Sequence, residues 1–175
     1  RSGDSKWITG EAARSEVQCL RRWTDAIIVG GETVRKDDPS LAVREPPDWP
    51  RQPLRFVWSR GQKERFPKTL SVCQPRDGRS ATFVSSKGAS EWRAWLESLG
   101  RQQITAVLAE GGGELAAELL NSRAVDKVVW FVAPKILGGR TSRPAVGGPD
   151  PAALSDCIEV GAIQVECRGK DLMLT

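Results

Sequence analysis

The residues of this chain that could do chemistry lie in two turns. Asp37 and Asp38 come shortly after an apolar run at residues 26–29. Glu110 and three glycines directly follow a second apolar run at 104–109. Ligands of open α/β sheets bind beyond the carboxyl ends of such strands. The sequence therefore predicts a nucleotide-sized ligand held between the two turns.

The second turn consists of Gly111, Gly112 and Gly113 and leads into a helix. Glycine lets a ligand approach the backbone closely, and a helix N-terminus favours a phosphate. A dinucleotide fingerprint also needs an acid about 20 residues further on, and none stands there, so an NAD-type Rossmann site is disfavoured. A phosphorylated cofactor fits this turn, and a tight turn that needs positive φ is the alternative. Glu110 either faces the ligand or is a solvated acid at a strand end.

The two aspartates, and the arginines Arg21 and Arg44, each have more than one interpretation. Adjacent aspartates point in different directions, so one of Asp37 and Asp38 could face the ligand while the other braces the turn before Pro39. A metal site, an acid/base pair and a helix-ending turn are the other possibilities. Arg21 and Arg44 could each bind a phosphate through two hydrogen bonds, or they are surface arginines.

Composition excludes several classes of function. The 175 residues predict one domain, with 39% apolar and 27% charged residues and a net charge of +4. The absence of histidine excludes a Ser-His-Asp triad and, with four scattered cysteines, makes a zinc site unexpected, so we expect no metal. Basic residues are dispersed among acids rather than gathered in a stripe, which disfavours nucleic-acid binding. No apolar run is long enough to cross a bilayer, and nothing resembles a signal peptide.

Hydrophobic periodicity predicts helices and strands that alternate along the chain. Thr9 is a suitable N-cap for a helix over 10–23, and Ser90 for a helix that contains Trp92. Alternation implies a mostly parallel sheet, to which a terminal hairpin adds an antiparallel edge. Strands are expected at 26–30, 54–58, 81–85, 104–109 and 127–133, helices at 31–38 and 114–121, a Gly/Pro loop at 134–153, and the hairpin at 158–167 and 171–174.

Taken in order, several short segments resemble the C-terminal reductase domain of the RibD family, the bifunctional pyrimidine deaminase/reductases of riboflavin biosynthesis. Each segment alone is weak, but the ordered set is specific and spans residues 5 to about 139. The matching segments are 5–9, 25–30, 33–34, 37–44, 110–112, 125–126 and 133–139.

The resemblance implies a dihydrofolate-reductase-like α/β fold, with a mostly parallel sheet flanked by helices, in a single domain over residues 1–175. It implies NADPH-dependent reduction of 5-amino-6-(5-phosphoribosylamino)uracil to the ribitylamino product, with Asp37 as the candidate catalytic residue. The implied substrate contacts are Ser5, Arg21, Leu41, Arg44 and Glu110. The implied cofactor contacts are Trp7, Thr33, Asp37, Ser59, Gly112, Gly113, Glu114 and Leu115.

The resemblance also sets expectations beyond the site. The family has a further strand upstream of the residues that correspond to Arg1, and an N-terminal zinc deaminase domain, so we expect both in the full-length protein. A homodimer is expected, as is a cytoplasmic location, or a plastid location if a transit peptide has been removed. Three rival functions remain: a dihydrofolate or pteridine reductase of the same fold, a non-catalytic nucleotide-binding domain, and an anion- or nucleic-acid-binding module.

Overall fold

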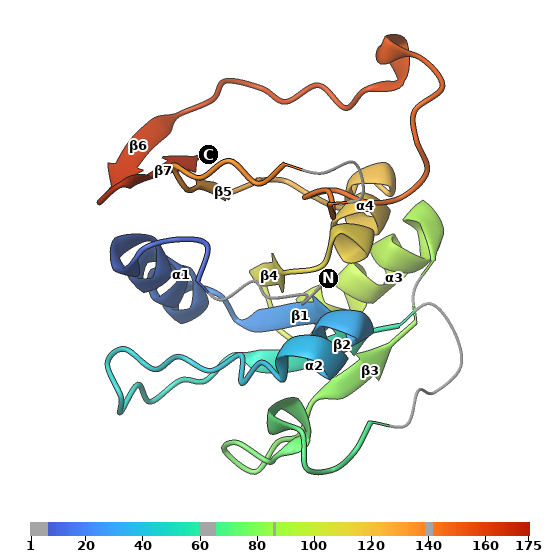
Figure 1. Ribbon diagram of the computed structural model, residues 1–175. Coiled ribbons are helices and arrows are strands. Elements are labelled where there is room, and N and C mark those ends of the chain that lie inside the picture. Colours follow the sequence, from blue (N-terminus) through green and yellow to red (C-terminus); the bar gives the residue numbers. More distant parts are fainter. Residues whose placement is uncertain (1–6, 60–65, 86, 139–141) are drawn as a thin grey trace.

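The computed structural model describes residues 7–59, 66–85, 87–138 and 142–175. Its centre is a four-stranded parallel sheet in the order β3-β2-β1-β4 (Figure 1). This arrangement confirms the predicted α/β class with a parallel central sheet. The strands are β1 (Ala26–Gly30), β2 (Leu54–Trp58), β3 (Thr82–Val84) and β4 (Val107–Glu110).

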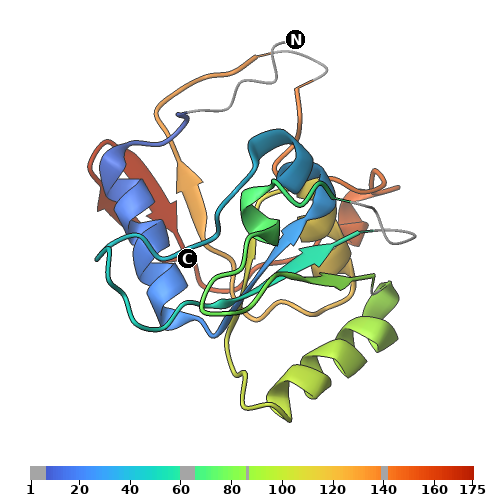
Figure 2. The same ribbon diagram turned by 90° about the horizontal axis from the view of Figure 1, so that it is seen from below.

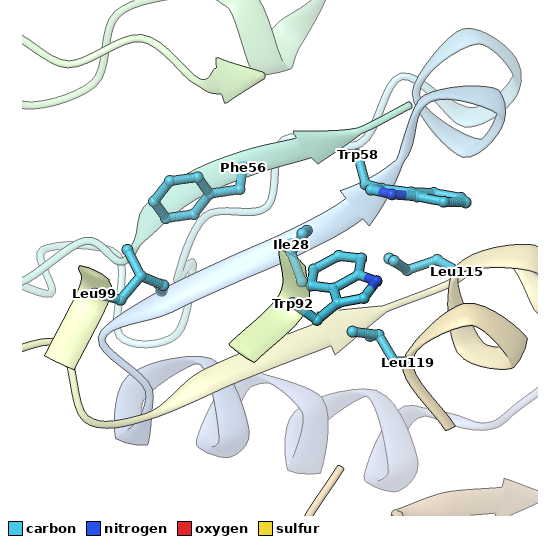
Figure 3. Packing of buried hydrophobic residues seen from close by; sticks show 8 residues of the cluster. Ile28, Phe56, Trp58, Trp92, Leu99, Leu115 and Leu119 are labelled. Atoms are coloured by element: carbon cyan, nitrogen blue, oxygen red, sulfur yellow. The ribbon is translucent and has the colours of Figure 1, made fainter. Parts of the chain in front are cut away.

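The inner position of β1 follows from its composition. Residues 26–29 are all apolar and between 0 and 1% exposed, because a parallel strand covered on both faces has no solvent side. Alternate side chains enter two separate clusters. Ile28 packs with Phe56, Trp58 and Trp92 on one face (Figure 3), whereas Ile27 packs with Val57 on the other.

Three helices cover the two faces of the central sheet. α3 (Gly88–Gly100) and α4 (Gly113–Asn121) supply Trp92, Leu99, Leu115 and Leu119 to one cluster (Figure 3). α2 (Gly31–Asp37) supplies Val34 to the opposite cluster, together with Val72 of the short 3-10 helix η1 (Ser71–Cys73). Both faces are therefore closed by apolar contacts, and the ligand site is left to the ends of the strands.

The C-terminal hairpin does not extend the central sheet, and this corrects the sequence-based expectation. β6 (Val165–Arg168) and β7 (Asp171–Leu174) pair with β5 (Trp130–Val132) in a separate antiparallel sheet of order β5-β7-β6 (Figures 1 and 2). α1 (Glu11–Trp23) packs against β7, and buried Asp171 accepts a 2.6 Å hydrogen bond from the Gly10 amide. The hairpin pairs with β5 because β5 and α1 together give β7 a buried position.

Several predicted boundaries were wrong by a few residues. The N-cap of α1 is Gly10 rather than Thr9. Ser90 lies inside α3, whose N-cap is Lys87, with the Lys87 amide donating to the Glu91 carboxylate at 2.7 Å. The strands expected at 127–133 and 158–167 are shorter, and a 3-10 helix, η2 (Leu154–Asp156), follows the long loop. Within the residues that the structure describes, no helix has both the length and the apolar character that crossing a membrane requires.

Asp25 joins the start of β1 to the start of β4. Its Oδ2 accepts hydrogen bonds from the Thr105 amide at 2.8 Å, the Thr105 hydroxyl at 3.0 Å and the Ala106 amide at 3.1 Å, and Arg51 pairs with Oδ1. The pKa of this carboxyl lies below its ordinary value, mainly because the Thr105 amide donates a hydrogen bond to it. Burial has a smaller, opposite effect on the pKa. The carboxylate form is therefore favoured in the folded protein.

The Asp25→Ala variant will lose about 1–3 kcal/mol of unfolding free energy at neutral pH, since two amides lose their acceptor. Because the folded pKa lies below the unfolded value of about 3.9, this stabilisation is complete above that value and is lost as the pH falls through the folded pKa. Urea unfolding at a series of pH values measures both effects. Asp25→Asn, which keeps an acceptor oxygen without a titrating charge, will lose less stability and flatten the acid limb. An unchanged acid limb in Asp25→Asn would contradict the assignment.

Candidate functional site

A pocket of about 430 Å³ lies at the carboxyl ends of β1 and β2 and beside the start of α4. The volume is within the range of small-molecule sites, roughly 300–1,000 Å³. β1 and β4 are neighbouring parallel strands, so the turns that follow them meet at one edge of the sheet. The pocket brings together seven of the eight predicted cofactor residues, namely Thr33, Asp37, Ser59, Gly112, Gly113, Glu114 and Leu115.

The glycine turn packs directly against the start of α2. Gly111 and Gly112 have φ values of +62° and +83°, which side-chain-bearing residues rarely adopt. A Cβ at Gly112 would lie 3.0 Å from the Thr33 hydroxyl, so the two turns touch without a side chain between them. α4 begins at Gly113, and the first amides of a helix have no carbonyl partner within it. The turn therefore has the backbone geometry of an anion-binding helix start.

The long Gly/Pro loop returns to this turn and forms one side of the pocket. The Gly147 amide donates to the Gly113 carbonyl at 2.9 Å, and a Cβ at Gly113 would lie 2.9 Å from the Gly147 nitrogen. Arg143 and Pro144 of the same loop also line the pocket. Sequence reasoning missed these loop residues, because a Gly/Pro loop has no periodicity that reveals where it folds back. It also missed Glu32 of α2, which lines the pocket next to the predicted Thr33.

The two aspartates have separate roles. Asp37 lines the pocket. Asp38, at φ 41°, ends α2 and turns away, and its carboxylate accepts hydrogen bonds from the Ser71 amide at 2.6 Å and the Ser71 hydroxyl at 3.0 Å. One aspartate thus faces the pocket while the other braces the turn, which was one of the alternatives that the sequence left open.

Arg21 and Glu110, both predicted substrate contacts, form an ion pair with each other. Arg21 donates from Nε to one Glu110 oxygen at 2.7 Å and from Nη2 to the other at 2.6 Å, and its Nη1 donates to the Ala42 carbonyl at 2.9 Å. The side chains are 10% and 19% exposed. Arg21 therefore lies on the buried face of its helix, not on a surface face, and Glu110 is a paired rather than a solvated acid.

The segment 41–44 is held against α1 beside this ion pair. The Gln18 side chain accepts a 2.8 Å hydrogen bond from the Arg44 amide. Leu41 is 1% exposed and has φ of +54°, an uncommon backbone conformation for leucine. The Arg44 side chain is exposed to solvent. None of the four predicted substrate residues within the described chain lines the pocket, although Glu110 directly precedes the glycine turn.

The two remaining predicted residues precede α1. Ser5 lies outside the residues that the structure describes. Trp7 does not line the pocket and is 64% exposed. Its ring lies 4.5 Å from the Arg14 guanidinium, and its carbonyl accepts a 2.9 Å hydrogen bond from Lys135. The structure thus places Trp7 beside the loop that leaves β5.

In α/β domains with an open parallel sheet, ligands bind beyond the carboxyl ends of adjacent strands. The pocket of this protein lies at that place, so the fold and the site are those of a ligand-binding α/β domain. The family model of the RibD C-terminal domain matches residues 1–173, and the chain belongs to that family. This match confirms the family that the ordered motifs had indicated, and with it the dihydrofolate-reductase-like α/β fold.

Individual relatives give the extent of the likeness. The riboflavin biosynthesis protein RibD of Escherichia coli is 33% identical over 200 residues, covering 99% of this chain and 54% of the relative. The RibD protein of Actinobacillus pleuropneumoniae is 30% identical over 196 residues, covering 99% of this chain and 51% of the relative. The chain thus spans about half the length of these curated relatives.

Solved structures agree with the sequence relatives. Acinetobacter baumannii RibD, form 1, superposes with a TM-score of 0.82 at 28% identity, covering 99% of this chain and 52% of that one. The Saccharomyces cerevisiae riboflavin biosynthesis reductase Rib7 superposes with a TM-score of 0.63 at 21% identity, covering 94% of this chain and 80% of that one. The second likeness shows a shared fold.

Proposed function

We propose that this chain catalyses the NADPH-dependent reduction of 5-amino-6-(5-phosphoribosylamino)uracil to the ribitylamino product, a step of riboflavin biosynthesis. The observation that carries the proposal is the meeting of the two predicted turns around one pocket. Family membership supports it, as does a Thermotoga maritima structure at 25% identity that bears the name of a deaminase and 5-amino-6-(5-phosphoribosylamino)uracil reductase. That neighbour superposes with a TM-score of 0.73 over 98% of this chain and 50% of its own.

The pocket residues fit a nicotinamide dinucleotide. Gly112 and Gly113 let a pyrophosphate approach the backbone at the start of α4, where amides and the helix dipole favour an anion. Thr33 and Ser59 provide hydroxyls for hydrogen bonds. When bound, NADPH would supply the hydride that the sugar carbon accepts. The protein then needs to position the two reactants, a contribution that can lower a barrier without a histidine base.

The substrate would lie beside this pocket, toward Glu110 and the 41–44 segment. Arg44 has an exposed side chain on a backbone that Gln18 holds, so it is the better candidate for the substrate phosphate. Arg21 is already engaged with Glu110 and Ala42, and in this proposal it sets the position of both. Asp37, which lines the cofactor pocket, would orient the cofactor or hold a proton.

The Arg44→Ala variant will have a KM for the phosphorylated substrate raised about 10- to 100-fold with a similar kcat, as loss of a charged hydrogen bond to phosphate predicts. Steady-state kinetics with varied substrate and saturating NADPH measures both constants. Arg101→Ala, at an exposed arginine beyond α3, is the matched control. An unchanged KM in Arg44→Ala would remove Arg44 from the phosphate site.

The proposed reaction is tested directly by following nicotinamide oxidation with the purified full-length protein and candidate substrates. Turnover of the ribosylaminopyrimidine without turnover of dihydrofolate supports the proposal, and the reverse result favours the pteridine reductase. Absence of turnover with either, in a protein that still binds NADPH, favours a non-catalytic domain. Supplying the deaminated and the diamino pyrimidine in parallel identifies the substrate form.

We also propose that the full-length protein adds a strand and a deaminase domain to this chain. Within the described residues β4 and β5 each lie at one end of their sheet, so each has an edge that a further strand could join. The chain matches about half of the RibD relatives, which leaves length for another domain. Hydrogen exchange in the full-length protein tests the strand, because rapid exchange at residues 107–110 would contradict it.

We propose that the full-length protein forms a homodimer. Exposed apolar side chains crowd the C-terminal segment, and a second copy would remove them from water. They include Leu154, Ile158, Val160, Ile163 and Val165. A single-chain mass in sedimentation equilibrium of the full-length protein would contradict the dimer.

We propose a cytoplasmic or plastid location for the protein. The plastid alternative rests on the maize and Arabidopsis thaliana relatives, which carry chloroplastic names. Fractionation of source cells tests the location.

A further inference from the structure

Two cations converge on one carboxylate at the edge of the pocket. Glu32 and Lys36 lie one turn apart on α2, and Arg143 comes from the long loop. Lys36 pairs with Glu32 Oε1, and Arg143 Nη2 donates to the same oxygen at 3.3 Å. The hydrogen bond and charge of Lys36, followed by the charge of Arg143, lower the pKa of Glu32 below its ordinary value. All three residues line the pocket.

These ion pairs are open to exchange with a ligand. The side chains of Lys36, Glu32 and Arg143 are 45%, 53% and 74% exposed. Exposed pairs contribute little stability, so replacing one anion partner by another costs little. A phosphate carries more charge and more acceptor oxygens than a carboxylate, and arginine matches its geometry with two parallel hydrogen bonds. The position that Glu32 occupies is thus a place where a phosphate can lie between two cations.

We propose that Lys36 and Arg143 bind the 2′-phosphate of the adenosine ribose, that this phosphate displaces the Glu32 carboxylate, and that the pocket thereby selects NADPH over NADH. The inference rests on the proposed nicotinamide-dependent function and names its specificity residues. The start of α4 then serves the pyrophosphate, and the Glu32 position serves the third phosphate. Glu32 is a competitor that the correct cofactor expels.

The opposite assignment is a Glu32 that accepts hydrogen bonds from the ribose hydroxyls of NADH, as an acidic residue does in many dinucleotide sites. The two assignments differ in the sign of one effect. If Glu32 competes with the 2′-phosphate, removing its charge strengthens binding of a 2′-phosphorylated nucleotide. If Glu32 binds the ribose, or if it merely ties the loop to α2, removing its charge weakens binding of every adenine nucleotide.

Isothermal titration of the purified full-length protein with 2′,5′-ADP and with 5′-AMP tests the proposal without turnover. We expect 2′,5′-ADP to bind at least about tenfold more tightly than 5′-AMP. Lys36→Gln and Arg143→Gln will each weaken 2′,5′-ADP binding about five- to tenfold and leave 5′-AMP binding unchanged. Glu32→Gln will strengthen 2′,5′-ADP binding about two- to fivefold. Arg101→Gln, outside the pocket, will change neither affinity.

Several results would overturn the inference: equal affinity for the two nucleotides, binding of neither, parallel weakening of both in Lys36→Gln and Arg143→Gln, or weakening in Glu32→Gln. Failure of the proposed function looks different. A protein that prefers 2′,5′-ADP with the expected variant effects, but turns over no pyrimidine, keeps the phosphate site and loses the reductase assignment. A protein that reduces the pyrimidine and binds both nucleotides equally loses the inference alone.

Discussion

Arg21→Met will have a kcat/KM about 100- to 1,000-fold below that of the parent protein and an unfolding free energy lower by about 3 kcal/mol. The guanidinium bonds both oxygens of Glu110 and the Ala42 carbonyl. Its removal leaves a largely buried carboxylate without its cation, and it releases the end of β4 together with the segment that carries Leu41 and Arg44. Steady-state kinetics and urea unfolding measure the two losses.

A double-mutant cycle with Glu110→Gln separates the ion pair from other effects of the methionine. Because Glu110→Gln removes the buried charge, the double variant will be more stable than the sum of the single losses predicts, by about 1–3 kcal/mol. Additive losses would contradict the pair. Arg21→Lys will rescue little activity, since an ammonium cannot bond both carboxylate oxygens and the carbonyl in this geometry.

Kinetics with the phosphorylated and the dephosphorylated ribosylaminopyrimidine distinguish a positioning role of Arg21 from direct contact with the phosphate. If Arg21 positions Glu110 and the 41–44 segment, Arg21→Met will lower kcat/KM equally for the phosphorylated and the dephosphorylated ribosylaminopyrimidine. A residue that binds the phosphate would instead lose rate with the phosphorylated compound only. Arg44→Ala provides the comparison, because it is expected to show the second pattern.

Arg55→Met will lower the unfolding free energy by about 3 kcal/mol with little change in the pocket. Arg55 belongs to β2 and is 5% exposed, and its guanidinium donates to the carbonyls of Ser71 at 3.3 Å, Gln74 at 2.9 Å and Arg79 at 2.8 Å. Burial, followed by the charge of Arg76, lowers the pKa of Arg55 below its ordinary value. The guanidinium therefore organises the 71–79 segment through carbonyls rather than through a carboxylate.

Urea unfolding measures the loss in Arg55→Met, and limited proteolysis locates it, with new cleavage expected within residues 71–79. Arg101→Met, at an exposed arginine, should stay within about 0.5 kcal/mol of the parent protein. A loss at Arg55 no larger than this control would mean that the three carbonyls are equally well satisfied by water.

Much of the fold could be predicted from local pattern. β1, β2 and β7 have the predicted bounds because each is a mostly apolar run ended by a glycine, a polar turn or the chain end. The hairpin partner was wrong, because strand pairing depends on which edge the chain reaches after the long loop. Ser90 and Thr9 were wrong as N-caps: the amides of the actual N-caps, Gly10 and Lys87, donate to the carboxylates of Asp171 and Glu91.

The candidate site divides in the same way. The cofactor half lies within turns that directly follow predicted strands, and parallel pairing brings their ends together. The substrate half depends on long-range contacts, such as the ion pair between Arg21 and Glu110, which are 89 residues apart. No periodicity distinguishes a buried, paired arginine from a surface one. Arg143 was missed for a related reason, because its place at the pocket depends on the path of a loop.

The sequence alone determined the succession of strands and glycine turns along the chain. That succession indicated the family and the edge of the sheet at which a ligand would bind. These follow from local chemistry, since apolar runs, glycine conformations and helix starts act over a few residues. Only the tertiary structure decided which charges meet: Arg21 with Glu110, Asp38 with Ser71, and Lys36 and Arg143 on Glu32. Charged side chains are long and their partners lie far away in the chain, so their pairing is settled only when the backbone has folded.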